Sequence, residues 1–182
     1  MRFSTPVEYE TITQALVKGA CPFCTYLKNF QSKILHELQD PAQVAGVCNF
    51  HAWAMAAAAN KAVVSAVFRK LMNSASCCEC TICKAIAAEE AAQMKEFAAN
   101  VQGTRVLEWI KSQGIFCIPH GTKLLSHVPT SLQQVVMNVL KRSTVQLQEA
   151  LEQVASGKSD DKGQGGGVLG HAAEFLVSQR GL

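Results

Sequence analysis

Residues 21–51 read CPFCTYLKNFQSKILHELQDPAQVAGVCNFH, and they contain a Cys-x2-Cys pair followed by a Cys-x2-His pair. The same pattern occurs a second time, where Cys80-Thr-Ile-Cys83 is followed by Cys117-Ile-Pro-His120. In both copies a glycine and an apolar residue precede the third cysteine, as in Gly46-Val47-Cys48 and Gly114-Ile115-Phe116-Cys117. Agreement over this many positions indicates an internal duplication.

The duplicated residue types are those that bind zinc. Zn²⁺ takes thiolate sulfur and imidazole nitrogen in a tetrahedron, and a Cys-x2-Cys knuckle places two sulfurs on one side of the ion. A cysteine and a histidine three residues apart lie about one helical turn from each other, so both can face the same ion. We therefore predict two Cys3His sites, one in each copy. Their ligands are Cys21, Cys24, Cys48 and His51 in the first copy and Cys80, Cys83, Cys117 and His120 in the second.

A site with four protein ligands has no open position for an activated water, whereas catalytic zinc usually has three protein ligands. The pattern therefore predicts two structural zinc ions and no catalytic residue. We interpret the protein as a zinc-stabilised scaffold or interaction protein of unknown cellular role, more in keeping with a binding protein than with an enzyme. The remaining histidines have no partner at ligand spacing.

Two alternatives use the same cysteines for other chemistry. Clustered thiolates also hold iron–sulfur clusters, and Cys77 and Cys78 lie outside the pattern either as bystanders or as extra ligands. Cys21-Pro-Phe-Cys24 is also similar to a thioredoxin or glutaredoxin active site, but those folds need a strand before the motif and a parallel sheet around it. A redox protein, or a regulator that senses metal or oxidant, is therefore the alternative function.

The periodicity of apolar residues predicts an all-α fold. Apolar residues recur every three or four positions over residues 22–38, in a second stretch from His51 to about residue 73, over residues 80–101, in a shorter helix near residues 106–110 and over residues 130–154. No stretch shows sustained alternation, so we expect no sheet beyond short ribbons at the knuckles.

We predict a helical bundle of two tandem helical-hairpin modules, each clamped by its own Cys3His site. The expected parts are an N-terminal segment (1–20), a first module (21–76), a second module (77–155) and a flexible Gly-rich tail with one or two helical turns (156–182). The linker from Ser156 to Gly167 is too polar to bury apolar area.

Composition limits the partners that we expect. The 182 residues carry a net charge of only +3, with Lys and Arg dispersed among Asp and Glu, which gives no case for binding nucleic acid or a membrane surface. The first ten residues lack the apolar core of a secretory signal, so we expect a cytoplasmic protein whose cysteines stay reduced. We expect the partner to be another protein, of unknown identity, and the alanine-rich face at residues 56–59 would also allow a homodimer.

The arrangement of Cys21-Pro-x-Cys24, a helix, and Gly46-Val-Cys48-x-x-His51, repeated once, resembles a family of uncharacterised prokaryotic helical proteins that share a domain of unknown function. The resemblance covers residues from about 20 to 155. Cys80-Thr-Ile-Cys83 departs from it, because the proline of the stricter motif is missing. The resemblance implies a helical fold with metal sites, and it implies no reaction.

Overall fold

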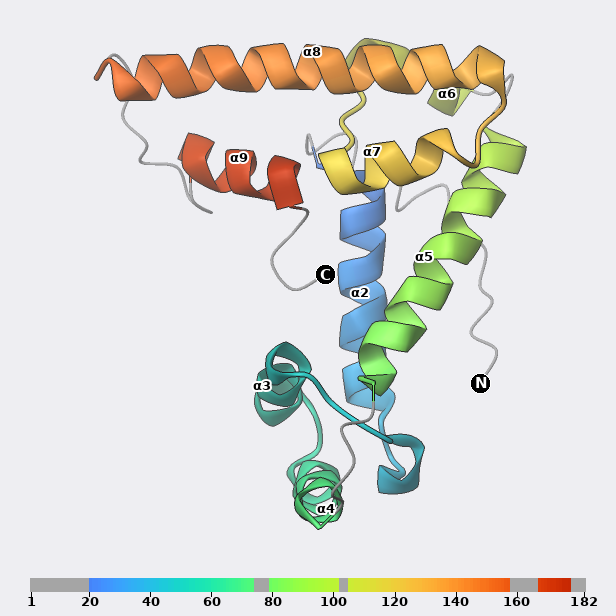
Figure 1. Cartoon of the computed structure of the whole chain (residues 1–182), viewed down its shortest axis with the longest axis vertical. Coiled ribbons are helices and arrows are strands. Elements are labelled where there is room, and N and C mark those ends of the chain that lie inside the picture. Colours follow the sequence, from blue (N-terminus) through green and yellow to red (C-terminus); the bar gives the residue numbers. More distant parts are fainter. Residues whose placement is uncertain (1–19, 74–78, 102–104, 158–166, 178–182) are drawn as a thin grey trace. The chain divides into compact units, whose positions relative to one another are not determined.

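The computed structural model describes residues 20–73, 79–101, 105–157 and 167–177, and all regular structure within these ranges is helical (Figure 1). The predicted all-α fold is confirmed. None of the described helices is both long enough and apolar enough to cross a membrane. The helices in chain order are α2 (Pro22–Glu37), the short 3-10 helix η1 (Pro41–Gln43), α3 (Asn49–Ala58), α4 (Lys61–Met72), α5 (Thr81–Asn100), α6 (Arg105–Gln113), α7 (Ile118–Leu125), α8 (Thr130–Ala155) and α9 (Gly167–Val177).

Contacts within the chain define two compact units. Unit 1 contains residues 20–26 and the described residues from Ala92 onward, and unit 2 contains the described residues of Leu27–Ala91. The division falls within α2 and within α5, so each of these helices contributes residues to both units. Both units therefore draw on both copies of the sequence pattern.

The core of unit 1 is built around three aromatic rings. Phe23 lies against Phe97 edge to face, with ring centroids 5.4 Å apart, and is stacked on Phe116 at 6.1 Å. Phe116 is fully buried. Helices α7 and α8 pack closely beside this core, since a Cβ atom placed on Gly121 of α7 would lie 2.7 Å from Leu140 of α8. Leu132, Val136 and Val139, on the apolar face of α8, are also part of this core.

Helix α9 is longer than the one or two turns predicted for the tail, and it packs against α7 and α8. Ala172 and Phe175, three residues apart on one face, are both buried. Burial of this face holds residues 167–177 against unit 1, so this part of the tail belongs to the folded protein. Much of the predicted linker, residues 158–166, lies outside the described residues.

Unit 2 differs from the sequence prediction between residues 51 and 73. The single helical stretch predicted there is wrong, because the chain forms α3 and α4 with a break at Ala59 and Asn60. The side chain of Asn60 caps α4 by accepting hydrogen bonds from the backbone N–H groups of Ala62 and Val63, at 2.9 and 3.4 Å. This cap satisfies N–H groups that a helix start leaves unpaired, and it favours a new helix at Lys61.

Arg142 of α8 ties down the C-terminal end of α6. Its guanidinium donates hydrogen bonds to the carbonyl oxygens of Lys111 at 2.5 Å and Gly114 at 2.8 Å. These carbonyls lie at a helix end, where the backbone lacks partners of its own. Gly114 is also sterically required, since an added Cβ would lie 2.7 Å from the backbone of Ile110.

We expect Arg142→Met to lower the free energy of unfolding by about 1–3 kcal/mol, because carbonyls that accept from a charged donor lose their partner. Urea denaturation of the protein with its metals bound measures the loss. Lys141→Met removes the same charge from the exposed neighbouring position and is the control. Equal losses from the two variants would show that the hydrogen bonds of Arg142 contribute nothing specific.

Candidate metal centres

The eight predicted ligands come together in two Cys3His groups, but the predicted pairing within each copy is wrong. Site A consists of Cys21, Cys24, Cys117 and His120, and site B consists of Cys48, His51, Cys80 and Cys83. Within each group the four ligand atoms lie within 4.8 Å of one another. Each site thus combines the Cys-x2-Cys pair of one copy with the Cys-x2-His pair of the other. Site A belongs to unit 1 and site B to unit 2.

The length of the helices explains this exchange. Cys21 and Cys24 lie at the start of α2, and the 16 residues of that helix extend about 24 Å. Cys48 comes only after the far end of α2 and a connection that includes η1, so it is not returned to the start of the helix. Helix α5, with 20 residues, separates Cys80 from Cys117 in the same way. Each Cys-x2-Cys knuckle therefore lies beside the Cys-x2-His pair of the other copy, and not beside the pair that follows it in the sequence.

All eight ligands lie at helix N-termini. Cys48 and Cys117 are the N-cap residues of α3 and α7, in extended conformation, and the histidine follows in the first helical turn. Helices α2 and α5 begin one residue after the first cysteine of each knuckle. A Cys3His site that holds Zn²⁺ has a formal charge of −1, and the positive ends of the helix dipoles stabilise that charge.

The spacing of the ligand atoms in site A suits a single tetrahedral ion. With ordinary Zn–S and Zn–N bond lengths, a tetrahedron has edges of about 3.8 Å between sulfurs and about 3.6 Å between sulfur and nitrogen. The Sγ atoms of Cys24 and Cys117 are 3.6 Å apart. The Nδ1 atom of His120 lies 3.6 Å from Cys21 Sγ, 3.2 Å from Cys24 Sγ and 3.0 Å from Cys117 Sγ. A disulfide needs sulfurs about 2.05 Å apart, so these thiols are not bonded to one another.

Site B has the same geometry. Its Sγ atoms of Cys48 and Cys83 are 3.7 Å apart. The Nδ1 atom of His51 lies 3.3 Å from Cys48 Sγ, 3.4 Å from Cys80 Sγ and 3.3 Å from Cys83 Sγ. The backbone N–H of Cys83 donates to Cys80 Sγ at 3.5 Å, the turn expected of a metal knuckle. Both sites therefore present one nitrogen and three sulfurs to a common centre.

The two sites differ in their exposure to solvent. All four ligands of site A are buried. In site B, His51 and Cys80 are buried, Cys48 is half-buried and Cys83 is exposed. Reagents in solution can thus contact a sulfur of site B directly, whereas no ligand of site A is exposed.

The thiols of each site titrate unequally. Burial raises the pKa of Cys21, but hydrogen bonds from Cys117, Cys24 and His120 outweigh it and lower that pKa well below its usual value. The hydrogen bond to Cys21 raises the pKa of Cys117 to about 12. In site B burial, followed by hydrogen bonds to Cys80 and Cys48, raises the pKa of Cys83 to about 12.

Burial also lowers the pKa of His51, which favours the neutral imidazole. Neutral imidazole is the form that binds a metal ion. The Nδ1 atom of this ring faces the three sulfurs, while its Nε2 atom is buried and has no hydrogen-bond partner among the described residues. The ring of Phe50 packs against it edge to face, with centroids 5.1 Å apart, and helps to fix its orientation.

A pair of hydrogen bonds at site B explains why its knuckle has threonine where site A has proline. The backbone N–H of Thr81 donates to the carbonyl of Gly46, and the hydroxyl of Thr81 accepts from the N–H of Ala45, both at 3.0 Å. These bonds join the two halves of site B just outside the ligands. Pro22 holds the matching position in site A and has no N–H to donate. The departure from the stricter motif therefore has a structural role.

Sequence reasoning identified the eight residues that form the two groups but missed the residues that support them. The pairing of Phe23, Phe97 and Phe116 follows from tertiary packing, although Phe23 and Phe116 stand next to ligand cysteines in the sequence. Cys77 and Cys78, the bystanders or extra ligands of the prediction, lie outside the described residues.

Comparison of the chain with protein-family models, with curated proteins and with solved structures gave no significant match. The metal centres are therefore interpreted from their own geometry. The resemblance to an uncharacterised prokaryotic family remains a prediction.

Proposed function

We propose that this protein is a zinc-stabilised helical scaffold that binds another protein and has two structural Cys3His sites. The observation that supports the proposal most directly is the closed set of four protein ligands in each unit, at separations that fit a tetrahedral ion. Three thiolates and one imidazole are a donor set that zinc favours. With all four positions filled by the protein, the zinc would hold helix ends together and would not activate water.

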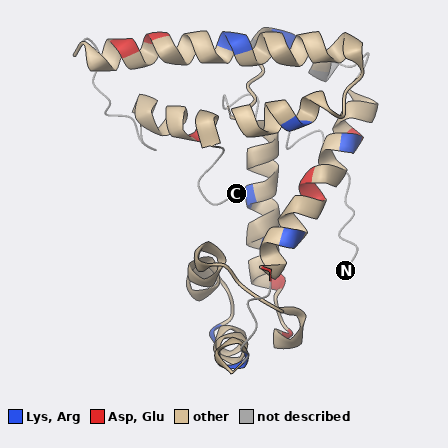
Figure 2. Ribbon diagram, in the orientation of Figure 1, with Lys and Arg blue, Asp and Glu red and all other residues tan. Residues whose placement is uncertain are grey.

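The surface of unit 2 supports the interaction role. Helix α3 contains no charged residue (Figure 2). On it Trp53 is 74% exposed and Phe50 is 43% exposed. Large apolar side chains gathered on one uncharged helix favour contact with another protein. A partner protein or a second copy of this chain would cover them.

Metal analysis of protein purified without oxygen tests the proposal. We expect two zinc ions per chain, one for each ligand group, and no visible absorption band. Iron together with acid-labile sulfide would contradict the proposal and favour the redox alternative. A chain that folds with all its helices and binds no metal would contradict both.

The exposure of Cys83 favours a second candidate function, a sensor of metal or oxidant at site B. Hydrogen peroxide would take two electrons from two thiolates of site B, forming a disulfide and water and releasing zinc. Cys48 and Cys83, whose sulfurs are 3.7 Å apart, are the pair best placed for that bond.

We expect peroxide to release one zinc ion about tenfold or more faster than the other, because oxidation of cysteine follows exposure, and Cys83 of site B is exposed whereas all ligands of site A are buried. A colour-forming zinc indicator follows the release, and mass spectrometry of alkylated peptides identifies the cysteines that were oxidised. Simultaneous loss of both ions, or earlier oxidation of Cys24 and Cys117, would contradict the expectation.

A further inference from the structure

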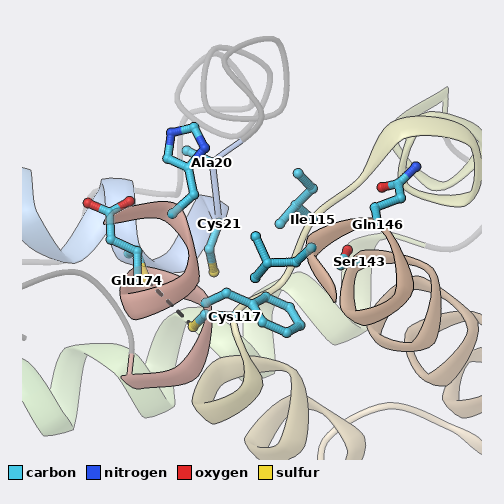
Figure 3. A pocket seen from close by; sticks show the side chains of 11 residues that line it. Ala20, Cys21, Ile115, Cys117, Ser143, Gln146 and Glu174 are labelled. Carbon is cyan, nitrogen blue, oxygen red and sulfur yellow. Dashed lines mark hydrogen bonds between the residues drawn. The ribbon is translucent and has the colours of Figure 1, made fainter. Parts of the chain in front are cut away.

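A cavity of about 220 Å³ lies beside site A in unit 1 (Figure 3). One wall consists of the ligand cysteines Cys21, Cys24 and Cys117, and the rest of the lining comes from Ala20, Ile115, α8 and α9. A metal ion at site A would take up the part of this space beside the cysteines, whereas the lining residues from α8 and α9 have no role in holding that ion. The volume of the cavity suits a small organic molecule of a few heavy atoms, since ligand pockets for larger, drug-sized molecules begin at about 300 Å³.

Ser143 marks this cavity as a polar site. Its side chain is only 7% exposed and lines the cavity, and its Oγ atom has no hydrogen-bond partner among the described residues. Leaving a buried hydroxyl unsatisfied costs free energy, so such groups are normally paired with protein, water or ligand. The neighbouring Gln146 adds an amide to the same end of the cavity.

The charges around the cavity favour a cation. Glu174 of α9, an exposed residue, supplies a carboxylate, and the lining includes His171 but no lysine or arginine among the described residues. The adjoining Cys3His group would add a formal charge of −1 when it holds zinc. Figure 3 shows Glu174 on one side of Cys117 and Ser143 with Gln146 on the other, so the two polar ends are separate. Ile115, Leu147 and Phe175 add apolar side chains to the lining.

We propose that this cavity binds a small aliphatic amine that carries a hydroxyl group at its other end. The ammonium group is held by the carboxylate of Glu174, the alkyl chain lies against the apolar residues, and the hydroxyl pairs with Ser143 and Gln146. This binding site goes beyond the structural role proposed for the metals. It gives the scaffold a small-molecule ligand whose polar groups match those of the lining.

Aminopentanol is a suitable probe, and amide chemical shifts of the zinc-bound full-length protein follow its binding. We expect shifts concentrated near Ser143 on α8 and Phe175 on α9. Pentylamine and pentanediol, which each lack one of the two polar interactions, should bind several-fold more weakly, and hydroxypentanoate should not bind because its carboxylate meets Glu174. Equal binding of hydroxypentanoate, or no shifts at any soluble concentration of aminopentanol, would overturn the proposal.

Two variants test the two polar ends of the cavity independently. Glu174→Gln should weaken aminopentanol binding by about tenfold, as expected for loss of a charge-assisted hydrogen bond, while Glu149→Gln, which changes a likewise exposed carboxylate on α8 that does not line the cavity, should not. Ser143→Ala should weaken aminopentanol but not pentylamine, and should not destabilise the protein without ligand, because the deleted hydroxyl has no partner among the described residues.

Equal effects of Glu174→Gln and Glu149→Gln would also overturn the proposal. Zinc content is measured for every sample. If the protein contains both zinc ions but does not bind aminopentanol, only the proposal of a cavity ligand is contradicted. If zinc is missing, the proposed function is contradicted.

Discussion

Replacing Cys24 by serine is expected to remove the metal from site A and unfold unit 1, while the metal of site B stays bound. Structural zinc contributes roughly 10–16 kcal/mol of apparent binding free energy in small metal-binding peptides, and a whole domain is stable by only about 5–15 kcal/mol. Unit 1 therefore cannot lose its ion and keep its fold. Metal analysis should give one zinc per chain, and hydrogen exchange should show lost protection in α7 and α8.

Double substitutions test the pairing itself. His120→Ala added to Cys24→Ser should remove no further metal, because both residues belong to site A. Cys48→Ser added to Cys24→Ser should remove the second ion, because it breaks site B as well. If the sites were paired within each copy, Cys24 and Cys48 would share one ion, and Cys24 and His120 would belong to different sites. A single remaining zinc in the Cys24→Ser, Cys48→Ser variant would therefore contradict the exchanged arrangement.

Phe116→Ala is expected to have the largest effect of any substitution outside the ligands. The side chain is 0% exposed, and its ring lies 6.1 Å from that of Phe23 and 6.3 Å from that of Phe97. Truncating a buried phenylalanine costs about 3–5 kcal/mol, because the transfer free energy is lost and a cavity remains. Since Cys117 follows directly, the loss should also weaken the metal affinity of site A. Denaturation of the zinc-bound protein and competition with a chelator measure the two effects.

Trp53→Ala is the control for this experiment. It removes a larger ring, but one that is 74% exposed, so the free energy of unfolding should change by less than about 0.5 kcal/mol. A loss below about 1 kcal/mol for Phe116→Ala would show that the aromatic cluster does not organise unit 1. Weakening of site B to the same degree as site A would contradict the assignment of Phe116 to unit 1.

The sequence predicted those elements that have a strong local signal. Helix α2 was predicted over residues 22–38 and is observed at Pro22–Glu37, because its apolar residues recur at helical spacing and Pro41 prevents continuation. The break between α3 and α4 was missed. The predicted stretch ran without a break from His51 to about residue 73, and the run of alanines at residues 56–59 has no periodicity that reveals a helix end. Asn60 was the available signal, since asparagine is a preferred N-cap residue.

The pairing of the half-sites could not be predicted from residue spacing. The two Cys-x2-Cys pairs have the same donor atoms, and so do the two Cys-x2-His pairs, so either combination satisfies the chemistry of zinc. Proximity in sequence favoured pairing within each copy. The structure differs because rigid helices carry the chain away from each knuckle before the next ligands appear. The supporting contacts of Thr81 and Phe116 depend on that tertiary arrangement and have no local signature.

The exchange of half-sites has a consequence for biosynthesis. A ribosome delivers the chain from its N-terminus, so Cys21 and Cys24 emerge first but have to wait for His120, the last ligand to be made. All ligands of site B are already present once Cys83 has emerged. Zinc can therefore enter the exposed site before the buried one, although two thiols of the buried site, Cys21 and Cys24, are the oldest in the nascent chain. During this interval Cys21 and Cys24 depend on a reducing environment for protection.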